Sequence, residues 1–272
     1  MPLKYRVLSF HHITNNGAFL FAHTLSSWLQ AELHPAEVKI LDYKSPRLHL
    51  AENIKRFKIF QSIPLFYARR SQLWRELLAS HLELDEDYPH FWGPKKLQRY
   101  LAERFDGLIV GMDVWCLTRG TERPTFPNIY WLPEKIAIPK IAYGVSAYNS
   151  DAALIHRNRE MITTYLNDFT VIGSRDRFTH DMVQQYRTRP DGLVEKVPDP
   201  AFLYSIQPTG VKQKLARMGI DFKRPILGIL LFGDRQISAE IQKHYHAKGY
   251  QILALSMYNP IADFNLGHLL TP

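Results

Sequence analysis

The sequence lacks the features that mark secreted, disulfide-stabilised and membrane-spanning proteins. It contains one cysteine, Cys116, so no intramolecular disulfide can form, and this usage fits a reducing compartment. Residues 1–12 hold too short an apolar run for a signal peptide. No run approaches the roughly 18 consecutive apolar residues of a membrane span. We therefore expect a soluble cytoplasmic protein.

Several signatures of ligand binding are missing as well. The sequence has neither the dinucleotide fingerprint GxGxxG nor the phosphate-loop pattern GxxxxGK followed by Ser or Thr. It has no Lys/Arg-rich run with interleaved aromatic residues, so we expect no nucleic-acid partner. His11, His12 and His23 have no cysteine or carboxylate at metal-ligand spacing, so we expect no metal.

The chain does have a large apolar fraction and an excess of positive charge. Hydrophobic residues make up 46% of it, enough for a sizeable core, and the formal net charge is +8. This balance favours anionic partners such as phosphorylated metabolites or anionic lipid. Residues 54–75 are basic and contain no acidic residue. That segment is either a solvated helical face or a peripheral contact with an anionic membrane.

Short strands and helices alternate along the first three quarters of the chain. The opening predicts a strand at 5–10, a helix at 18–33 and a strand at 38–43, which is the start of a parallel sheet. The alternation continues with predicted strands at 107–110, 140–145, 168–172 and 193–197 and predicted helices at 97–104, 151–166 and 179–186. We therefore predict an α/β fold with a parallel sheet over residues 1–205.

The last quarter reads as a linker followed by a second β–α–β unit. Residues 206–224 form the predicted linker, with a short helix at 211–218. The unit then has predicted strands at 225–232 and 250–256 around a helix at 238–246. Two strands cannot close an independent doubly wound domain. We therefore expect residues 225–272 to be the start of a truncated second domain, with an extra flap on the first domain as the alternative.

The most informative stretch is FDGLIVGMDVW, which ends in Asp113, Val114 and Trp115. It predicts a buried strand that opens into a polar loop. In open α/β sheets such strand ends line the ligand crevice. Asp113 is therefore a candidate base or hydroxyl-binding group, with a loop aspartate that caps backbone amides as the equal alternative. Trp115 and Cys116 are expected to be packing residues.

The loop between the first strand and the first helix reads HHITNNG. Its residues Asn15, Asn16 and Gly17 could present backbone N–H groups and the positive helix end to an anion. The alternative is an ordinary turn in which Thr14 or Asn15 caps the helix. One of the adjacent His11 and His12, in the same loop, could face the crevice as a general acid or base, and His12 is the candidate.

Arg175 follows the predicted strand at 168–172 in the run SRD. An arginine at a strand end can clamp a carboxylate or phosphate through two parallel N–H groups. The alternative is an ion pair with Asp176 or Asp199, and Asp199 itself is typical of a structural turn, since Pro200 follows it. The sequence leaves both interpretations of Arg175 open.

In this order, the segments resemble the polysaccharide pyruvyl transferase family. RVLSFHHITNNGAFLFAHTLSSWL resembles its first strand, Asn/Gly loop and helix, and FDGLIVGMDVW its strand ending in Gly-Ser-Asp with a nearby Trp. IAYGVSAY resembles its Ser-Tyr-Ala-Ala-Ser-like strand. VIGSRDRFTHDMV, followed by VEKVPDPAFLY, resembles its Ser-x-Arg-Asp/Glu segment and its Asp-Pro strand end. The resemblance covers nearly the whole chain.

The chain departs from the family pattern in two places. Met112 stands where the family has a serine beside Asp113, so a hydroxyl role is missing there. The family also has a Ser-Phe-His-Gly-like segment in its second half, and no such segment follows Phe222. The basic donor-site residues expected in that half are missing with it.

The resemblance implies two facing Rossmann-like domains in a glycosyltransferase-B-like arrangement, of which this chain has the first and an incomplete second. It implies transfer of a pyruvyl group from phosphoenolpyruvate to a hydroxyl pair of a sugar, usually as a cyclic ketal, with no nucleotide or redox cofactor. The acceptor would be a glycan or lipid-linked saccharide, a precursor of cell-surface or exopolysaccharide. For such a reaction our hypothesis takes Asp113 and His12 as the catalytic residues and Asn15, Asn16, Gly17 and Arg175 as the substrate-binding residues.

Two other functions remain open at this point. One is a nucleotide-sugar-dependent glycosyltransferase of the same architecture, which would bind a nucleotide sugar instead of phosphoenolpyruvate. The other is a non-catalytic glycan-binding remnant, which would hold a saccharide without turnover. Analogy at the level of the fold does not separate these three.

Overall fold

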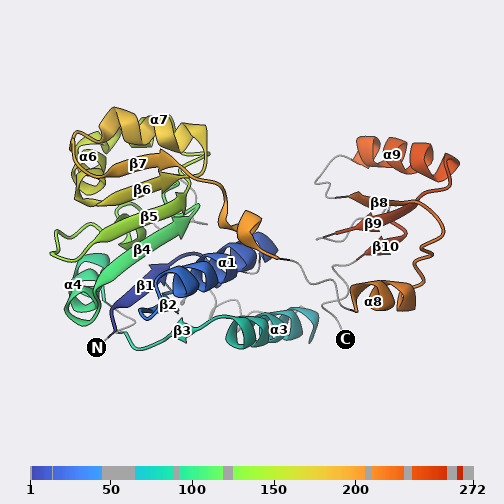
Figure 1. The fold of residues 1–272 in the computed structure, drawn as a ribbon. Helices are drawn as coiled ribbons and strands as arrows, with labels where there is room; N and C mark the ends of the chain where they lie inside the picture. Colours follow the sequence, from blue (N-terminus) through green and yellow to red (C-terminus); the bar gives the residue numbers. More distant parts are fainter. Residues whose placement is uncertain are drawn as a thin grey trace. The chain divides into compact units, whose positions relative to one another are not determined.

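The computed structural model describes residues 2–13, 15–44, 65–88, 92–118, 125–205, 210–229, 235–255 and 262–265. The chain divides into two units, each of which is described by itself. The first comprises Met1–Ser62 and Trp74–Tyr204, and the second comprises Ile63–Leu73 and Ser205–Pro272. Both units are built from parallel strands and helices (Figure 1).

The first unit is organised around a seven-stranded parallel sheet with the strand order β3-β2-β1-β4-β5-β6-β7. Its strands are β1 (Lys4–Leu8), β2 (Glu37–Leu41), β3 (Leu84–Asp85), β4 (Gly107–Met112), β5 (Lys140–Val145), β6 (Val171–Ser174) and β7 (Leu193–Lys196). The chain builds outward from β1 to β3, returns to the other side of β1, and then continues to β7. This is a Rossmann-like topology, so the predicted α/β class is confirmed. Its switch point, where such folds bind ligands, lies between β1 and β4.

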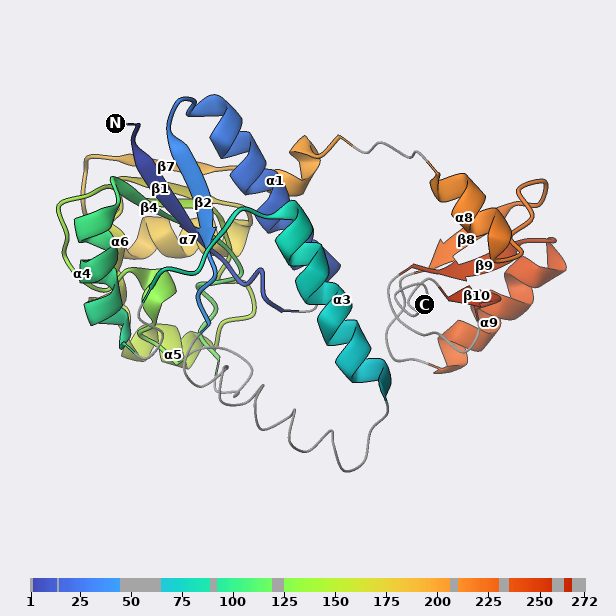
Figure 2. The same ribbon diagram turned by 90° about the horizontal axis from the view of Figure 1, so that it is seen from below.

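Helices cover both faces of this sheet. They are α1 (Asn16–Glu32), the part of α3 (Leu65–His81) from Trp74 onward, α4 (Pro94–Arg104), α5 (Ala152–Arg157), α6 (Arg159–Asp168) and α7 (Arg177–Tyr186), with short 3-10 helices η1 (Ile129–Trp131) and η2 (Pro200–Leu203). Figure 2 shows α1 on one face and α4, α6 and α7 on the other. Right-handed crossovers require this, because the chain moves across the sheet in opposite directions before and after the switch point.

The predicted helix at 151–166 is wrong as a single element, because it breaks at Asn158 into α5 and α6. Asn158 has φ −102° and ψ 12°, and its side-chain amide donates to the carbonyl of Leu154 at 2.8 Å. An asparagine that bonds its own backbone competes with the helical hydrogen-bond ladder. The break therefore has a local cause.

Two glycines let α1 approach the strands closely. A Cβ atom at Gly111 in β4 would stand 2.8 Å from the ring of Phe21 and 2.8 Å from the carbonyl oxygen of Tyr143. Gly144 in β5 has φ +63° and lies against the same ring. The fully buried Phe21 therefore docks α1 onto the carboxyl ends of β4 and β5.

The second unit contains a three-stranded parallel sheet with the order β10-β9-β8. Its elements are α8 (Val211–Arg217), β8 (Ile226–Ile229), α9 (Arg235–Ala247), β9 (Gln251–Ala254) and β10 (Phe264–Asn265). Four of the five match predicted elements, and β10 was not predicted because two residues carry no periodic signal. A small apolar cluster of Ile229, Ile252 and Ala254 forms its described core.

The predicted membrane contact at residues 54–75 falls mostly outside the described residues. Residues 54–64 are not described, and nothing is described of the side chains at 65–71. The contact therefore stays a prediction. Within the described part of the chain, no helix combines the length and apolar character needed to span a bilayer.

Candidate functional site

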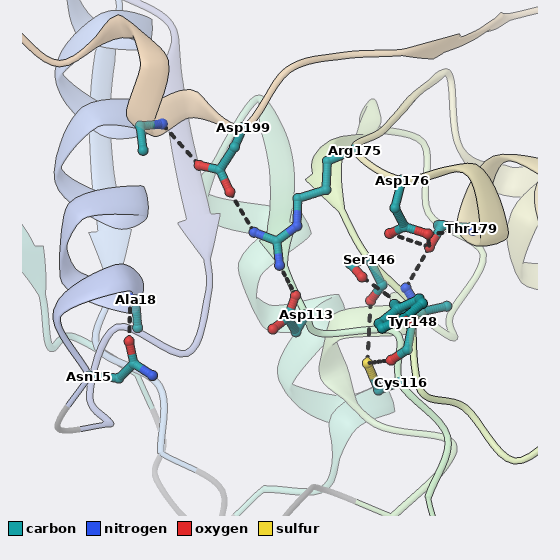
Figure 3. A network of polar contacts seen from close by, with 12 residues as sticks. Asn15, Ala18, Asp113, Cys116, Ser146, Tyr148, Arg175, Asp176, Thr179 and Asp199 are labelled. Carbon is teal, nitrogen blue, oxygen red and sulfur yellow. Dashed lines mark hydrogen bonds and ion pairs between the residues drawn. The ribbon is translucent and has the colours of Figure 1, made fainter. Parts of the chain in front are cut away.

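Three loops at the carboxyl edge of the large sheet meet at one arginine. Asp113 follows β4, Arg175 follows β6 and Asp199 follows β7 (Figure 3). Arg175 donates through Nη1 to Asp199 Oδ2 at 2.6 Å and through Nη2 to Asp113 Oδ1. The structure thus brings together two of the predicted site residues. The third member, Asp199, was predicted only as a turn residue and as an alternative ion-pair partner.

This Asp113–Arg175–Asp199 triad carries two formal negative charges and one positive charge. Its side chains are only partly buried, with 33%, 24% and 30% of their surfaces exposed in that order. Such a group is accessible to a ligand. Its excess of negative charge disfavours a phosphate or carboxylate and suits the hydroxyl hydrogens of a neutral ligand.

A strained turn presents Asp113. Met112, the residue before it, has φ 81°, in the left-handed region that costs a non-glycine residue about 1–3 kcal/mol. The pairing register between β4 and β5 also shifts between Gly111 and Met112. The loop after β5 holds this turn, because Ser146 N donates to the Met112 carbonyl at 2.9 Å and Trp115 N donates to the Ser146 carbonyl at 3.3 Å. Strain of this kind persists where the surroundings fix it, and it is typical of functional sites.

Arg175 and Asp199 are held by independent contacts. The backbone N–H of Arg175 donates to the carbonyl of Val145 at 3.1 Å. Asp199 caps η2, since its Oδ1 accepts from Ala201 N at 2.9 Å. The guanidinium carbon of Arg175 also lies 5.9 Å from the centroid of the Phe21 ring, a cation–π contact. Arg175 therefore joins three strand-end loops and rests on α1.

Asn15 caps α1, as one of the two interpretations of its loop predicts. Its Oδ1 accepts from Gly17 N at 2.8 Å. The same oxygen accepts from Ala18 N at 3.2 Å (Figure 3). The other interpretation is that backbone N–H groups at the start of α1 bind an anion, and these are two of those groups. Asn15, Asn16 and Gly17 are exposed at the positive end of α1, where the loop after β1 reaches the same sheet edge as Asp113. Thr14 lies outside the described residues.

His12 is buried in the loop after β1, with 7% of its surface exposed. Burial, together with the nearby His11 and Lys44, lowers its pKa to about 3, against a small opposing effect of Asp42. Among the described residues, neither ring nitrogen has a hydrogen-bond partner. The imidazole is therefore neutral at neutral pH, which favours a hydrogen-bonding role over that of an imidazolium acid.

His11 lies in the same loop, and the sequence alone did not distinguish its environment from that of His12. It is fully buried, and its Nε2 lies 2.9 Å from Asp42 Oδ1 while its Nδ1 lies 3.4 Å from Ser9 Oγ. Its ring meets that of His12 edge-on at 5.7 Å. The two adjacent histidines therefore differ in environment, one with polar partners on both nitrogens and one without.

A second polar network organises the loop after β5 (Figure 3). Cys116 Sγ donates to the carbonyl of Tyr148 at 2.9 Å, and Ser146 Oγ accepts from Tyr148 N at 3.1 Å. Ala147 N donates to Thr179 Oγ1 at 2.7 Å, and that hydroxyl in turn donates to Asp176. Cys116 is buried and has a structural role in this network, which agrees with the prediction that it is a packing residue.

Trp115 is likewise a packing residue. It is completely buried, stacks on Trp131 with ring centroids 5.0 Å apart, and donates through Nε1 to the carbonyl of Tyr130 at 2.9 Å. It anchors the turn that carries Asp113. Within the described residues, no three histidine, cysteine or carboxylate side chains gather as metal ligands.

Comparison with known proteins gives one family and 28 similar chains of solved structures, two of which are described below. A family model described as polysaccharide pyruvyl transferase matches residues 15–264. The fold is similar to UDP-GlcNAc 2-epimerase from Neisseria meningitidis bound to UDP-GlcNAc, at 11% identity and a TM-score of 0.48. It is also similar to a "putative UDP-N-acetylglucosamine 2-epimerase" from Listeria monocytogenes, at 11% identity and a TM-score of 0.47. The chain spans 66% and 64% of those two structures, and 96% of it is covered in each case. No curated protein matches it.

Proposed function

The chain belongs to the polysaccharide pyruvyl transferase family, and from that premise we propose that it takes part in moving a pyruvyl group from phosphoenolpyruvate to a pair of sugar hydroxyls. The acceptor is a glycan or lipid-linked saccharide that serves as a precursor of cell-surface or exopolysaccharide. The product is a cyclic ketal, and inorganic phosphate leaves. The donor is a cytoplasmic metabolite, so we place the reaction on the cytoplasmic side.

This reaction makes three demands on a protein. The donor's carboxylate and phosphate need cationic and N–H contacts. The enol carbon C3 must be protonated so that C2 becomes an oxocarbenium-like electrophile. Each sugar hydroxyl must lose its proton as it attacks C2, and the phosphate takes the bonding electrons when it departs. No redox or nucleotide cofactor is needed.

We assign Asp113 to the acceptor. A carboxylate accepts hydrogen bonds from neighbouring hydroxyls and can take the proton of the attacking one. The observation that carries this assignment is the Arg175 bridge, which fixes Asp113 at the carboxyl edge of β4 while leaving a third of its side-chain surface exposed. Arg175 is then a positioning residue, because its two outer nitrogens are already bonded to Asp113 and Asp199.

We assign the donor to the loop after β1, which neighbours β4 across the switch point. The positive end of α1, with Asn15, Asn16 and Gly17, attracts an anion. His12 is neutral at neutral pH and has unpartnered ring nitrogens among the described residues, so it can donate a hydrogen bond to a donor oxygen. This division keeps the anionic donor away from the negatively charged triad.

The test is a labelled transfer assay with the purified protein. Phosphoenolpyruvate carrying ¹³C at C3 is supplied with a polyprenyl-diphosphate-linked disaccharide or with methyl glycosides, and NMR follows the label. We expect phosphate release that depends on the saccharide and a new methyl signal from the ketal. Consumption of a nucleotide sugar in place of phosphoenolpyruvate would instead establish a glycosyltransferase. Saccharide binding without turnover of either donor would establish a glycan-binding protein.

A further inference from the structure

Tyr148 combines an exposed ring with a tightly held backbone. It lies in the loop after β5, and 60% of its surface is exposed. Other large aromatic residues near these strand ends, Trp115 and Tyr130, are at most 1% exposed. A single exposed aromatic residue is common on protein surfaces and needs no explanation by itself. The contacts that hold this one are what distinguish it.

The backbone around Tyr148 is fixed on both sides. Its N–H donates to Ser146 Oγ at 3.1 Å, and its carbonyl accepts from Cys116 Sγ at 2.9 Å. The residue before it is held too, since Ala147 N donates to Thr179 Oγ1 at 2.7 Å and the Ala147 carbonyl accepts from Ser150 Oγ at 2.6 Å. Four hydrogen bonds thus hold a loop whose central side chain is left in solvent. A ring displayed in this way loses little conformational freedom when a ligand covers it.

The ring also has an aromatic neighbour. Phe178 of α7 meets it with ring centroids 6.5 Å apart and an interplanar angle of 87°. In this edge-to-face geometry one ring presents its edge and the other its face, which limits how Tyr148 can turn. Phe178 is itself 39% exposed, so Tyr148 and Phe178 form a small exposed aromatic patch, here called the apolar step, at the sheet edge.

The step lies at the same edge as the proposed acceptor carboxylate. Ser146, whose hydroxyl holds Tyr148, donates its own N–H to the carbonyl of Met112, the residue before Asp113. Figure 3 shows Asp113 and Tyr148 on the loops that follow the neighbouring strands β4 and β5. The two residues therefore lie in loops that hydrogen bonds join to each other.

We infer that Tyr148 is the platform on which a pyranose ring of the acceptor saccharide stacks. A pyranose has a face of C–H groups that packs on an aromatic ring and a rim of hydroxyls that needs polar partners. With the sugar's face on Tyr148, its rim is directed along the sheet edge toward the Asp113 carboxylate. The orientation of the sugar toward Asp113 rests on the proposed function. The inference adds to that function the residue that selects a neutral saccharide as acceptor.

Binding and kinetics of three variants of the full chain test this inference. Tyr148→Ala removes the ring, Tyr148→Phe keeps it, and Leu193→Ala is the matched control. Leu193 is 50% exposed and begins β7, at the opposite edge of the same sheet. Saturation-transfer NMR reports binding of methyl pyranosides without any need for turnover, and UDP serves as a comparison ligand. Circular dichroism confirms that each variant is folded.

We expect the original chain, Tyr148→Phe and Leu193→Ala to transfer saturation to the pyranosides. With Tyr148→Ala the saturation-transfer signal of the pyranosides should be at least several-fold weaker. In the transfer assay, Tyr148→Ala should raise the acceptor KM about tenfold while kcat and the KM for phosphoenolpyruvate change little. Loss of saccharide binding in Tyr148→Ala in a protein that transfers no pyruvyl group would support the platform and overturn the proposed function. Equal saturation of Tyr148→Ala and the original chain, binding of UDP alone, or no pyranoside binding at all would overturn the platform.

Discussion

At the scale of single residues, the site depends on how Arg175 divides its hydrogen bonds between two carboxylates. The planar guanidinium can bond Asp113 and Asp199 at once because its two outer nitrogens diverge. A lysine carries one ammonium on a flexible stem and cannot reproduce that geometry. The arginine therefore does more than neutralise charge, since it sets the distance between the loops that follow β4 and β7.

Arg175→Lys should lower kcat/KM for pyruvyl transfer by about 10–100-fold. The loss of one charge-assisted hydrogen bond, worth about 1.5–3 kcal/mol, is enough for this. The matched control is Arg177→Lys, two residues away, where an 88% exposed arginine pairs with Asp181 at 3.4 Å. That change should stay within about twofold, because exposed pairs contribute little. Normal activity of Arg175→Lys would show that transfer does not need the simultaneous hydrogen bonds from one side chain to both carboxylates.

His12 makes stability depend on pH in a defined direction. Its pKa is about 3 in the folded chain and 6.5 in the unfolded one, so the unfolded state binds the proton more readily. Stability is therefore fully present above about pH 6.5 and falls as the pH falls toward 3. Between pH 7 and pH 5 this single group should cost about 2 kcal/mol.

Urea denaturation at pH 7 and pH 5 checks this expectation, with His12→Gln as the comparison. Glutamine keeps a polar side chain but does not titrate, so the variant should lose about 2 kcal/mol less than the original chain over the same interval. Its absolute stability at pH 7 is not the readout. If both proteins lose the same amount, His12 is not buried as a neutral imidazole.

At the scale of elements, the position of α1 depends on the absence of side chains in two strands. Phe21 fills the space that Gly111 and Gly144 leave open, and the same ring lies under Arg175. The helix that carries Asn15 at its start is thereby fixed against the strands that carry the triad. The packing of α1 on the strands therefore also determines the geometry of the site.

Gly111→Ala should destabilise the first unit by about 1–3 kcal/mol, the usual cost of overpacking. The added Cβ would meet a backbone oxygen, that of Tyr143, at 2.8 Å, and backbone moves less easily than a side chain. Gly93→Ala is the control, because a Cβ there has nothing within 4 Å and φ is −64°. Its effect should stay within about 0.5 kcal/mol. Equal free energies of unfolding for the two variants would refute the close approach of α1.

The sequence predicted long periodic elements well and short or interrupted ones poorly. The strand at 140–145 has the predicted bounds, and the helix predicted at 97–104 begins three residues earlier, at Pro94. The strand β3 was missed because it has two residues and forms through pairing with β2, which local pattern does not reveal. The break at Asn158 was missed because it arises from one side-chain hydrogen bond.

At the scale of the whole molecule, the order of strands decides which loops meet. Strand-end residues could be recognised in the sequence, which is why Asp113 and Arg175 were both candidates. That they bond each other follows from β4, β5 and β6 being neighbours, and this order is not written in local patterns. Asp199 was assigned to a turn, and only the position of β7 beside β6 makes it the second partner of Arg175. The exposure of Tyr148 likewise could not be predicted from IAYGVSAY, whose apolar character suggests burial.

The assignment of Asp113 to the acceptor is tested most sharply by comparing the original chain with Asp113→Asn in the labelled phosphoenolpyruvate assay. Asparagine keeps the size of the side chain but cannot accept the proton of a sugar hydroxyl, so kcat should fall by about 10²–10⁴-fold while the KM for phosphoenolpyruvate is unchanged. Asp199→Asn, which alters the other carboxylate on Arg175, should lose less. Transfer by Asp113→Asn at the original rate, or a rise in its KM for phosphoenolpyruvate alone, would contradict the assignment of this site to the acceptor.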